Sequence, residues 1–143
     1  MSGLTYYTYP GLGEYAYQVL GYNQAVRVGD RIECSGQGGW INPEEGQTEI
    51  TFPKSLEEEV KQAFRNVETA LKAAGGKGWS QVFRVNSYHT DITPELTAIM
   101  TANYKEWMPD HKPIWTQIGV AKLGVDEMRV EIEVSAYDPE GSK

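Results

Sequence analysis

One amphipathic helix with clear start and stop signals constrains this chain more than any other feature. Ser55, with Glu58 three residues later, forms the capping-box pattern that is typical of a helix N-terminus. Gly75 and Gly76 follow, where a left-handed C-terminal cap ends many helices. The apolar residues between these signals recur at steps of three and four on one face: Leu56, Val60, Phe64, Val67, Leu71 and Ala74. The sequence therefore predicts an amphipathic helix between Ser55 and Gly75.

The segments around this helix have mostly strand patterns. A second helix is predicted from Thr93, a suitable N-cap, with Pro94 in the first helical position, and Pro109 ends it. Residues 36–53 hold four glycines and two prolines and are predicted to be mostly loop, with a short strand near residues 48–52. Alternating apolar and polar residues predict the rest: a hairpin over 25–34 that turns at Gly29 and Asp30, and strands over 79–89, 113–121 and 127–137.

The strand over residues 79–89 is rich in β-branched and aromatic residues. Regular alternation along it predicts two faces. Phe83, Val85 and Ser87 are expected to point one way, and Val82, Arg84 and Asn86 the other.

The order of the elements predicts how the sheet is covered. They run strand, strand, helix, strand, helix, strand, strand, and two right-handed crossovers in one small sheet place both helices on the same face. The other face is then left without a helix and carries polar and charged residues beside apolar ones, with Arg84, Gln117, Glu131 and Glu133 among them. A partner subunit would cover such a face, so the pattern predicts an oligomer.

Length and charge limit the classes of function. A chain of 143 residues is expected to form one domain, 1–143. Its 13 Lys and Arg residues against 20 Asp and Glu residues give a net charge of −7, so nucleic acid is not an expected partner. The chain has one cysteine, Cys34, and two histidines, which are too few for an intramolecular disulfide or a structural zinc site. With no secretory signal pattern and no run of about 20 apolar residues, we expect no membrane association and a cytoplasmic location.

Residues 1–21 form a tyrosine-rich N-terminal arm. Six of the nine tyrosines precede the first basic residue, Arg27: Tyr6, Tyr7, Tyr9, Tyr15, Tyr17 and Tyr22. Tyrosine buries a large apolar area but needs a partner for its hydroxyl, so the arm is expected to pack against the domain. A second interpretation is that it forms one wall of a ligand site.

Glu131 and Glu133 are candidates for chemistry because both point to the same side of the last predicted strand. On a solvent-exposed face they would be ordinary surface carboxylates. If another subunit covers that face, one of them loses solvent, its pKa rises, and it can position or deprotonate water. The pattern leaves both interpretations open.

Other reactive side chains give weaker patterns. Ser35 lies in the segment CSGQGGW, which lacks the GxSxG nucleophile elbow and the Gly-Lys-Ser/Thr of a phosphate-binding loop. Cys34 is interpreted as a small buried hydrophobe. His89 and Asp91 could be a metal pair, but with no third ligand evident a strand-end hydrogen bond is preferred. No metal and no cofactor are expected.

Several segments together resemble the RidA (YjgF) family. They are YNQAVRVGDRIECSGQ at residues 22–37, ALKAAGG at 70–76, VNSYHTDI and ANYKEW around the second helix, and RVEIEVSAY at 129–137. The likeness covers about residues 20–138, in the same order and at similar spacings. It implies a chorismate-mutase-like α+β fold, a mixed sheet with two helices on one face. It also implies a homotrimer whose sheets line a central β-barrel, with small-molecule pockets at the three subunit interfaces.

The resemblance also implies an activity. Founding members hydrolyse reactive enamines and imines, formed from amino acids by pyridoxal-phosphate enzymes, to 2-keto acids and ammonia without a cofactor. A pocket arginine clamps the substrate carboxylate, and a glutamate on the last strand is thought to hold the attacking water. By this resemblance Glu131 is the catalytic glutamate, Tyr22 matches a pocket tyrosine, and Ser35 matches the serine of the SGQ motif.

The family's anchor arginine is absent from this chain. Where active deaminases have Pro, a small residue, Arg and then Ser or Thr, the chain has Pro113, Ile114, Trp115 and Thr116. Loss of a charge-assisted bidentate contact costs about 1.5–3 kcal/mol, so a 2-imino acid is not expected to bind in the usual pose. Gln117 replaces a common cysteine, and Thr101 falls where an asparagine is often found.

Three functions remain open. The first is a diverged hydrolase or deaminase that acts on a larger, flatter or less acidic imine or enamine, with Trp115 stacking on the substrate and Glu131 activating water. The second is a trimer that binds a small metabolite without turnover. The third, endoribonuclease activity or translation inhibition, is a name given to some relatives, and the net charge of −7 argues against it. The first is preferred because it explains why Glu131 occurs together with Tyr22 and Ser35.

Overall fold

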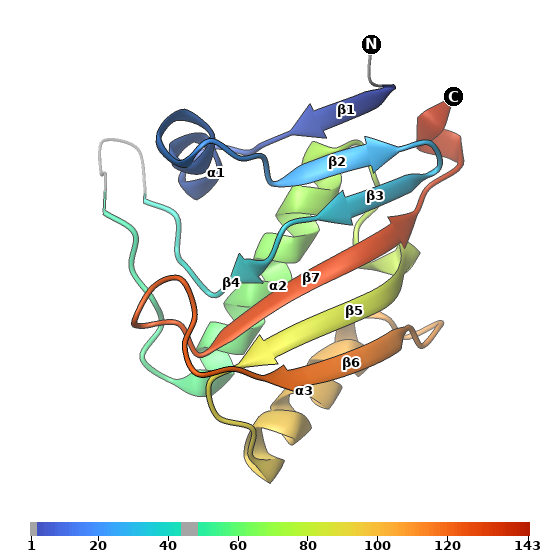
Figure 1. Cartoon of the computed structure of the whole chain (residues 1–143). Coiled ribbons are helices and arrows are strands. Elements are labelled where there is room, and N and C mark those ends of the chain that lie inside the picture. The colour runs from blue at the N-terminus through green and yellow to red at the C-terminus, as the bar shows by residue number, and fades with distance from the viewer. Residues whose placement is uncertain (1–2, 44–48) are drawn as a thin grey trace.

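A mixed sheet with two long helices on one side forms the structure, a computed structural model that describes residues 3–43 and 49–143 (Figure 1). The strands are β1 (Leu4–Tyr7), β2 (Ala25–Val28), β3 (Arg31–Cys34), β4 (Gln37–Gly38), β5 (Val82–His89), β6 (Ile114–Gly119) and β7 (Val130–Tyr137). The helices are α1 (Leu12–Tyr15), which continues into a π-helical turn (Ala16–Leu20), α2 (Leu56–Ala73) and α3 (Pro94–Trp107). Short 3₁₀ turns cover Trp79–Gln81 and Glu140–Ser142. Both predicted helices and the five predicted strands from residue 25 onward, apart from the short one near 48–52, are confirmed.

The last strand, β7, lies inside the sheet and organises it. The strand order is β1-β2-β3-β7-β5-β6, and β4 also pairs with β7, at Ile132 and Glu131. The β5–β6 pair is parallel and the other pairs are antiparallel. The predicted hairpin joins β2 to β3, and Gly29 at its turn has a φ of 60°, which a glycine adopts without strain. Within the described residues, β1 and β6 are therefore the edges of the sheet.

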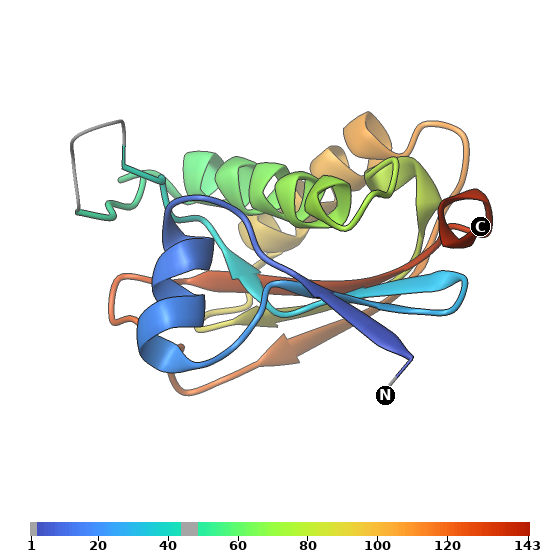
Figure 2. The ribbon, with the colours of Figure 1, turned by 90° about the horizontal axis from the view of Figure 1, so that it is seen from above.

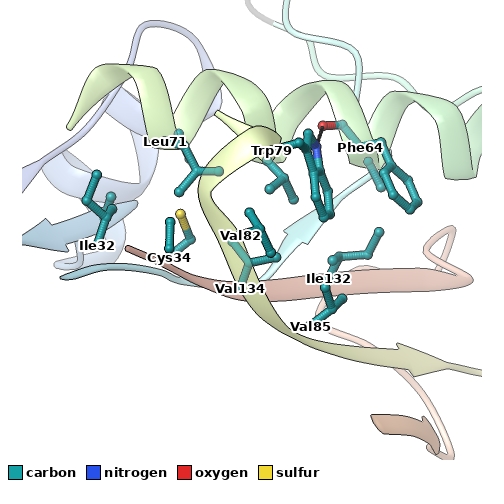
Figure 3. Close-up of a cluster of buried hydrophobic side chains, with 14 of the residues drawn as sticks. Ile32, Cys34, Phe64, Leu71, Trp79, Val82, Val85, Ile132 and Val134 are labelled. Atoms are coloured by element: carbon teal, nitrogen blue, oxygen red, sulfur yellow. Dashed lines mark hydrogen bonds between the residues drawn. The ribbon is translucent and has the colours of Figure 1, made fainter. Parts of the chain in front are cut away.

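Helices α2 and α3 lie on the same face of the sheet, as Figure 2 shows. Their apolar side chains and the inward-facing side chains of the strands form one core (Figure 3). Phe64 of α2 stacks on Trp79 with ring centroids 4.7 Å apart, and the Trp79 indole donates a hydrogen bond of 2.9 Å to the Phe64 carbonyl. No helix of the described chain crosses the opposite side of the sheet, called the open face below. The one-sided cover predicted from the element order is confirmed.

The signals at both ends of α2 act as predicted. The Ser55 hydroxyl accepts a 3.1 Å hydrogen bond from the backbone N–H of Glu58, and Gly75 follows the helix with a φ of 86°. The first turn also holds a buried carboxylate, Glu59, which pairs with Arg129 at 2.7 Å. Because Arg129 directly precedes β7, this ion pair ties the start of the helix to the start of the central strand.

The predicted facing of residues 82 and 83 is wrong. A β-bulge interrupts the pairing of β5 with β7, so that Val82 pairs with Ala136 and Arg84 pairs with the residue before it. The extra residue lets Val82 and Val85 both point into the core, and Phe83 is 37% exposed. Alternation assigns faces only along an uninterrupted strand, and nothing in the sequence marks the bulge.

Two short strands are absent from the sequence prediction. The arm contributes β1, which pairs with β2 at the edge, and β4 comes from the segment predicted as loop. A two-residue strand is too short to give a periodic pattern. Of the strand predicted near residues 48–52, Thr48 lies outside the described residues, and Thr51 forms only an isolated bridge with Ile41.

The N-terminal arm packs against the domain as expected, through Tyr9. This ring is 3% exposed, and its hydroxyl donates a 2.6 Å hydrogen bond to Gln37 and accepts one from the Trp40 indole. Gln37 in turn donates to the side chain of Gln24 at 2.8 Å. A buried polar network therefore joins the arm to β4 and to the segment before β2. In contrast, Tyr15 remains half exposed.

Candidate functional site

Glu131 lies on the open face at the start of β7. The neighbouring strand residues Val130 and Ile132 are fully buried under the helices, so Glu131 points the other way. Its side chain packs over Gly36, where any Cβ atom would overlap the carboxylate. The residue directly before β4 is therefore a glycine, because a side chain there would overlap the Glu131 carboxylate.

The carboxylate of Glu131 differs from the other two glutamates of the open face in having no partner. Glu133 accepts hydrogen bonds from the Tyr88 hydroxyl and from Asn86, the latter at 3.2 Å. Glu33 accepts from the Ser135 hydroxyl and from Arg31. Among the described residues, no side chain or backbone group donates a hydrogen bond to the carboxylate of Glu131. Of these three glutamates, Glu131 is the one whose carboxylate is free to bind a water or a ligand.

Burial raises the pKa of Glu131 above its ordinary value of 4.5, and the negative charge of Glu133 raises that pKa further. Both causes disfavour the charged form. A carboxyl group with a raised pKa is a stronger base when it is ionised, and it accepts a proton more readily near neutral pH. The carboxylate is thus partly desolvated within the single chain, whereas cover by another subunit, which the second sequence interpretation invoked, stays a prediction.

A pocket of about 330 Å³ opens beside Glu131. Three segments that Figure 1 shows at the same end of the sheet supply its walls: α1 with its π-helical turn, the chain after β4, and the loop between β6 and β7. Its wall is mainly apolar and aromatic, with Tyr15, Tyr22, Trp40, Phe52, Val125 and Met128 among the lining residues. The arm therefore packs on the domain and also lines this pocket, and the second sequence interpretation, that it is a wall of a ligand site, stays a prediction.

Tyr22 and Ser35 lie near Glu131, as the resemblance implied. Tyr22 lines the Glu131 pocket and also an adjoining hollow of about 500 Å³, which Ser35 lines. The Ser35 hydroxyl donates to the Gln24 carbonyl at 3.3 Å. The structure thus brings three of the expected site residues onto one side of one subunit.

Trp115 does not share that side. In the parallel β5–β6 pair it lies opposite Val85, whose side chain is buried under the helices, so the indole points toward α3. Its ring packs edge-on against Tyr104 of α3, with centroids 4.9 Å apart. Within one chain, Trp115 and Glu131 are therefore on opposite faces of the sheet and cannot contact one substrate.

The remaining candidates divide between the two sides. Gln117 was expected on the open face, but it lies opposite Ser87 on the helix side and accepts a 3.5 Å hydrogen bond from Thr97 of α3. That expectation is wrong because β6 pairs in parallel with β5, and the register of this pair turns the odd-numbered residues of β6 toward α3. Thr116 lies on the open face, opposite Asn86. Thr101 lines a hollow of about 680 Å³ at the C-terminal half of α3.

A buried hydrogen-bonded chain behind Trp115 has no counterpart in the sequence predictions. The indole N–H of Trp115 donates to the Ser87 hydroxyl at 2.9 Å, and Ser87 lies 2.8 Å from Nε2 of His89. Burial lowers the pKa of His89 to about 4, so the ring is neutral at physiological pH. A hydrogen bond was preferred for His89 over a metal pair with Asp91; the structure has one, but its partner is Ser87 and not Asp91. The sequence signal for this contact was the spacing of two residues between Ser87 and His89, which puts both side chains on the same face of β5.

Neither thiol nor metal chemistry is supported by the described residues. Cys34 is buried, and burial raises the pKa of its thiol to about 12, which keeps it protonated. Within residues 3–43 and 49–143, no three His, Cys, Asp or Glu side chains gather closely enough to hold a metal ion. The interpretation of Cys34 as a small buried hydrophobe agrees with this position.

These features define an α+β protein whose sheet is covered by helices on one face and carries a carboxylate pocket on the other. Comparison with known proteins identifies the family. The chain matches the model of the endoribonuclease L-PSP family over residues 15–138. It is 36% identical over 120 residues to the RutC family protein YjgH of Escherichia coli K12, covering 83% of this chain and 84% of that protein. The chain belongs to this family, the RidA/YjgF proteins, as the sequence motifs implied.

Two further relatives extend the comparison. The 2-iminobutanoate/2-iminopropanoate deaminase of Dermatophagoides farinae is 34% identical over 114 residues, covering 78% of this chain and 81% of that enzyme. The solved structure of protein YJGH is similar with a TM-score of 0.77 at 30% identity, covering 96% of this chain and 98% of that one. The RidA-type α+β fold is therefore confirmed.

Membrane-spanning helices were not expected from the sequence. Across the described residues, none of the helices combines the length and apolar character that crossing a bilayer requires.

The raised pKa of Glu131 has a consequence for stability. The folded-state pKa lies above the unfolded one, so the wild-type protein loses stability as the pH rises past about 4.5, while Glu131 ionises in the unfolded state first. We therefore expect Glu131→Gln to raise the Tm at pH 7, with the difference shrinking toward zero below the ordinary carboxyl pKa. Thermal unfolding of both proteins at a series of pH values measures this.

The variant Glu57→Gln, which removes an exposed carboxylate from the outer side of α2, is the control and should not raise the Tm at pH 7. A Glu131→Gln variant with the same Tm difference at every pH would contradict the desolvation of Glu131.

Proposed function

We propose that this chain is a RidA-like homotrimeric enzyme that hydrolyses an imine or enamine to a carbonyl compound and ammonia without a cofactor, on a substrate other than a simple 2-imino acid. The observation that carries the proposal is the carboxylate of Glu131, half-buried, unpaired and directed at an apolar pocket. The deaminase names of several relatives support the reaction class.

The proposed reaction needs one base and one water. Glu131 accepts a hydrogen bond from the water and takes its proton as the oxygen adds to the carbon of the protonated C=N bond. The resulting carbinolamine then receives that proton on its nitrogen. As its C–N bond breaks and the carbonyl forms, Glu131 takes the hydroxyl proton and passes it to the departing ammonia, which leaves as ammonium. Water is the only co-reactant, so atoms and charge balance without a cofactor. Desolvation of Glu131 assists the first step because it strengthens the base.

The opposite placement of Trp115 and Glu131 supports a site shared between subunits. Strand β6, which carries Trp115, is an edge strand of the described sheet, so its backbone is free to meet another copy. The open face lacks a helical cover, and partner sheets would complete it. In the proposed trimer, one subunit contributes Trp115, Gln117 and Thr101 to the site. The next subunit contributes Glu131, Tyr22 and Ser35, and Thr116 lies at the rim.

The substitution at the anchor position narrows the substrate. An arginine would form a bidentate pair with a substrate carboxylate, whereas the Trp115 indole offers a flat apolar surface whose N–H is already bonded to Ser87. Tryptophan in place of arginine at this position favours the binding of substrates that carry an aromatic or extended apolar group. The endoribonuclease name carried by the family is not adopted, because the net charge of −7 and the carboxylates of the open face repel phosphates.

A shared site predicts complementation between two inactive variants. Glu131→Ala and Trp115→Asp should each lose activity, but trimers assembled from an equal mixture should regain about a quarter of the wild-type rate, since one interface in four then carries both native residues. Light scattering should give a mass of about three times 16.0 kDa for each protein.

Failure of the mixture to exceed its separate components, with mixed trimers present, would place the site within one subunit. A monomer by light scattering would end the shared-site proposal.

Removal of the Glu131 carboxylate should abolish most of the activity. Loss of a general base lowers kcat by a factor of about 10²–10⁴, and the rate of ammonia release from enzymatically generated imines measures it. The variant Glu57→Ala, which removes an exposed carboxylate from α2, should keep the wild-type rate. If Glu131→Ala still accelerated ammonia release, the carboxylate would not be the base. If wild-type and variant were both inactive over the panel, the protein would be a binding protein.

Restoring the guanidinium tests the substrate assignment. Trp115→Arg should improve kcat/KM for simple 2-imino acids by about 10- to 100-fold, because a charge-assisted contact contributes about 1.5–3 kcal/mol. Trp115→Phe keeps an aromatic ring without the charge and should give no such gain. Equal behaviour of the two variants would show that the pocket has changed beyond the anchor position.

A further inference from the structure

The charge of the Glu131 pocket points to the class of ligand that it accepts. Two acidic residues, Glu131 and Glu127, line the pocket, and Lys, Arg and His are absent from its described lining. Glu131 has no partner, so its negative charge is not neutralised by the protein. A ligand carboxylate placed here would meet a like charge in a partly desolvated space, which is unfavourable.

The nearest basic residue in sequence does not offset this charge. Arg129 donates through Nε to the buried carboxylate of Glu59 at 2.7 Å and through Nη2 to the Lys54 carbonyl at 3.1 Å. Both partners lie at the start of α2, on the helix side of the sheet. The guanidinium is therefore held away from the open face by strong contacts.

The walls of the pocket suit an organic cation that carries an apolar group. Tyr15, Tyr22 and Trp40 contribute rings, and an organic cation gains from the negative faces of such rings as well as from a carboxylate. A volume of about 330 Å³ holds roughly ten non-hydrogen atoms, if each takes about the 30 Å³ that a water occupies. That is the size of one aromatic ring with a short aminoalkyl chain.

We propose that this pocket binds an arylalkyl cation with no carboxylate, a primary ammonium or its protonated imine. This rests on the proposed function and names its substrate class. The iminium R–CH=NH₂⁺ reacts with water to give the aldehyde R–CHO and ammonium, with Glu131 relaying the proton. The reaction that supplies such an imine is the two-electron oxidation of a primary amine, in contrast to the amino-acid chemistry that supplies a 2-imino acid.

Three ligands with the same ring and ethylene chain separate charge from shape: 2-phenylethylammonium, neutral 2-phenylethanol and anionic 3-phenylpropanoate. Calorimetry on the intact protein should show the ammonium binding about tenfold or more tightly than the alcohol, and no binding of the carboxylate. Glu131→Gln should reduce the affinity for the ammonium to that for the alcohol. The control Glu57→Gln, which removes the same charge outside the pocket, should leave all three affinities unchanged.

Equal or tighter binding of 3-phenylpropanoate would overturn the cation assignment, and an ammonium preference that Glu131→Gln leaves unchanged would overturn the part assigned to Glu131. Turnover is scored separately, with the imine of 2-phenylethylamine generated by an amine oxidase. If the ammonium binds but its imine is not hydrolysed faster than in buffer, the cation pocket stands and the proposed hydrolysis of this class fails. If 2-imino acids are hydrolysed while the ammonium does not bind, the hydrolase stands and the cation pocket fails.

Discussion

The strict alternation along β7 is the constraint on which the rest of the structure depends. It lies inside the sheet, pairs with β3, β4 and β5, and turns Val130, Ile132 and Val134 into the core. Because side chains alternate across a strand, the same backbone delivers Glu131 and Glu133 to the opposite face. Packing and chemistry therefore have a common origin, and a shift of one residue in register would destroy both.

The two glutamates show how similar positions acquire different properties. Glu133 is satisfied by Tyr88 and Asn86, whereas Glu131 faces an apolar pocket and has no hydrogen-bond donor among the described residues. An unpaired, desolvated carboxylate opposes folding at neutral pH, since the folded state disfavours its charge. Carboxylates whose raised pKa costs stability are found mostly in binding and catalytic sites, where the shifted pKa serves the function.

The chain has the family fold, and we propose a different ligand chemistry around its carboxylate. Trp115 is held by Ser87, which in turn contacts the neutral ring of His89, so the indole is fixed from behind by buried polar groups. By the family resemblance, its flat surface stands where active deaminases carry a positive charge. Together with the acidic lining of the Glu131 pocket, this is the basis of the proposed preference for cations over anions.

The sequence by itself determined the elements that have strong local signals. The capping box of Ser55 and Glu58, the glycine turn at Gly29 and the period-2 pattern of β7 each report an interaction between near neighbours, and the family motifs located Glu131. Only the tertiary structure decided how the strands meet. The bulge at Phe83 and the inward turn of Gln117 depend on pairing across strands.

The dependence on pairing across strands also limits what the sequence predicts about the candidate site. Tyr22, Ser35 and Glu131 could be grouped from the motifs, but their separation from Trp115 could not. Alternation tells which residues of one strand share a face. Which face of the sheet they occupy is set by long-range pairing and by the side on which α2 and α3 pack.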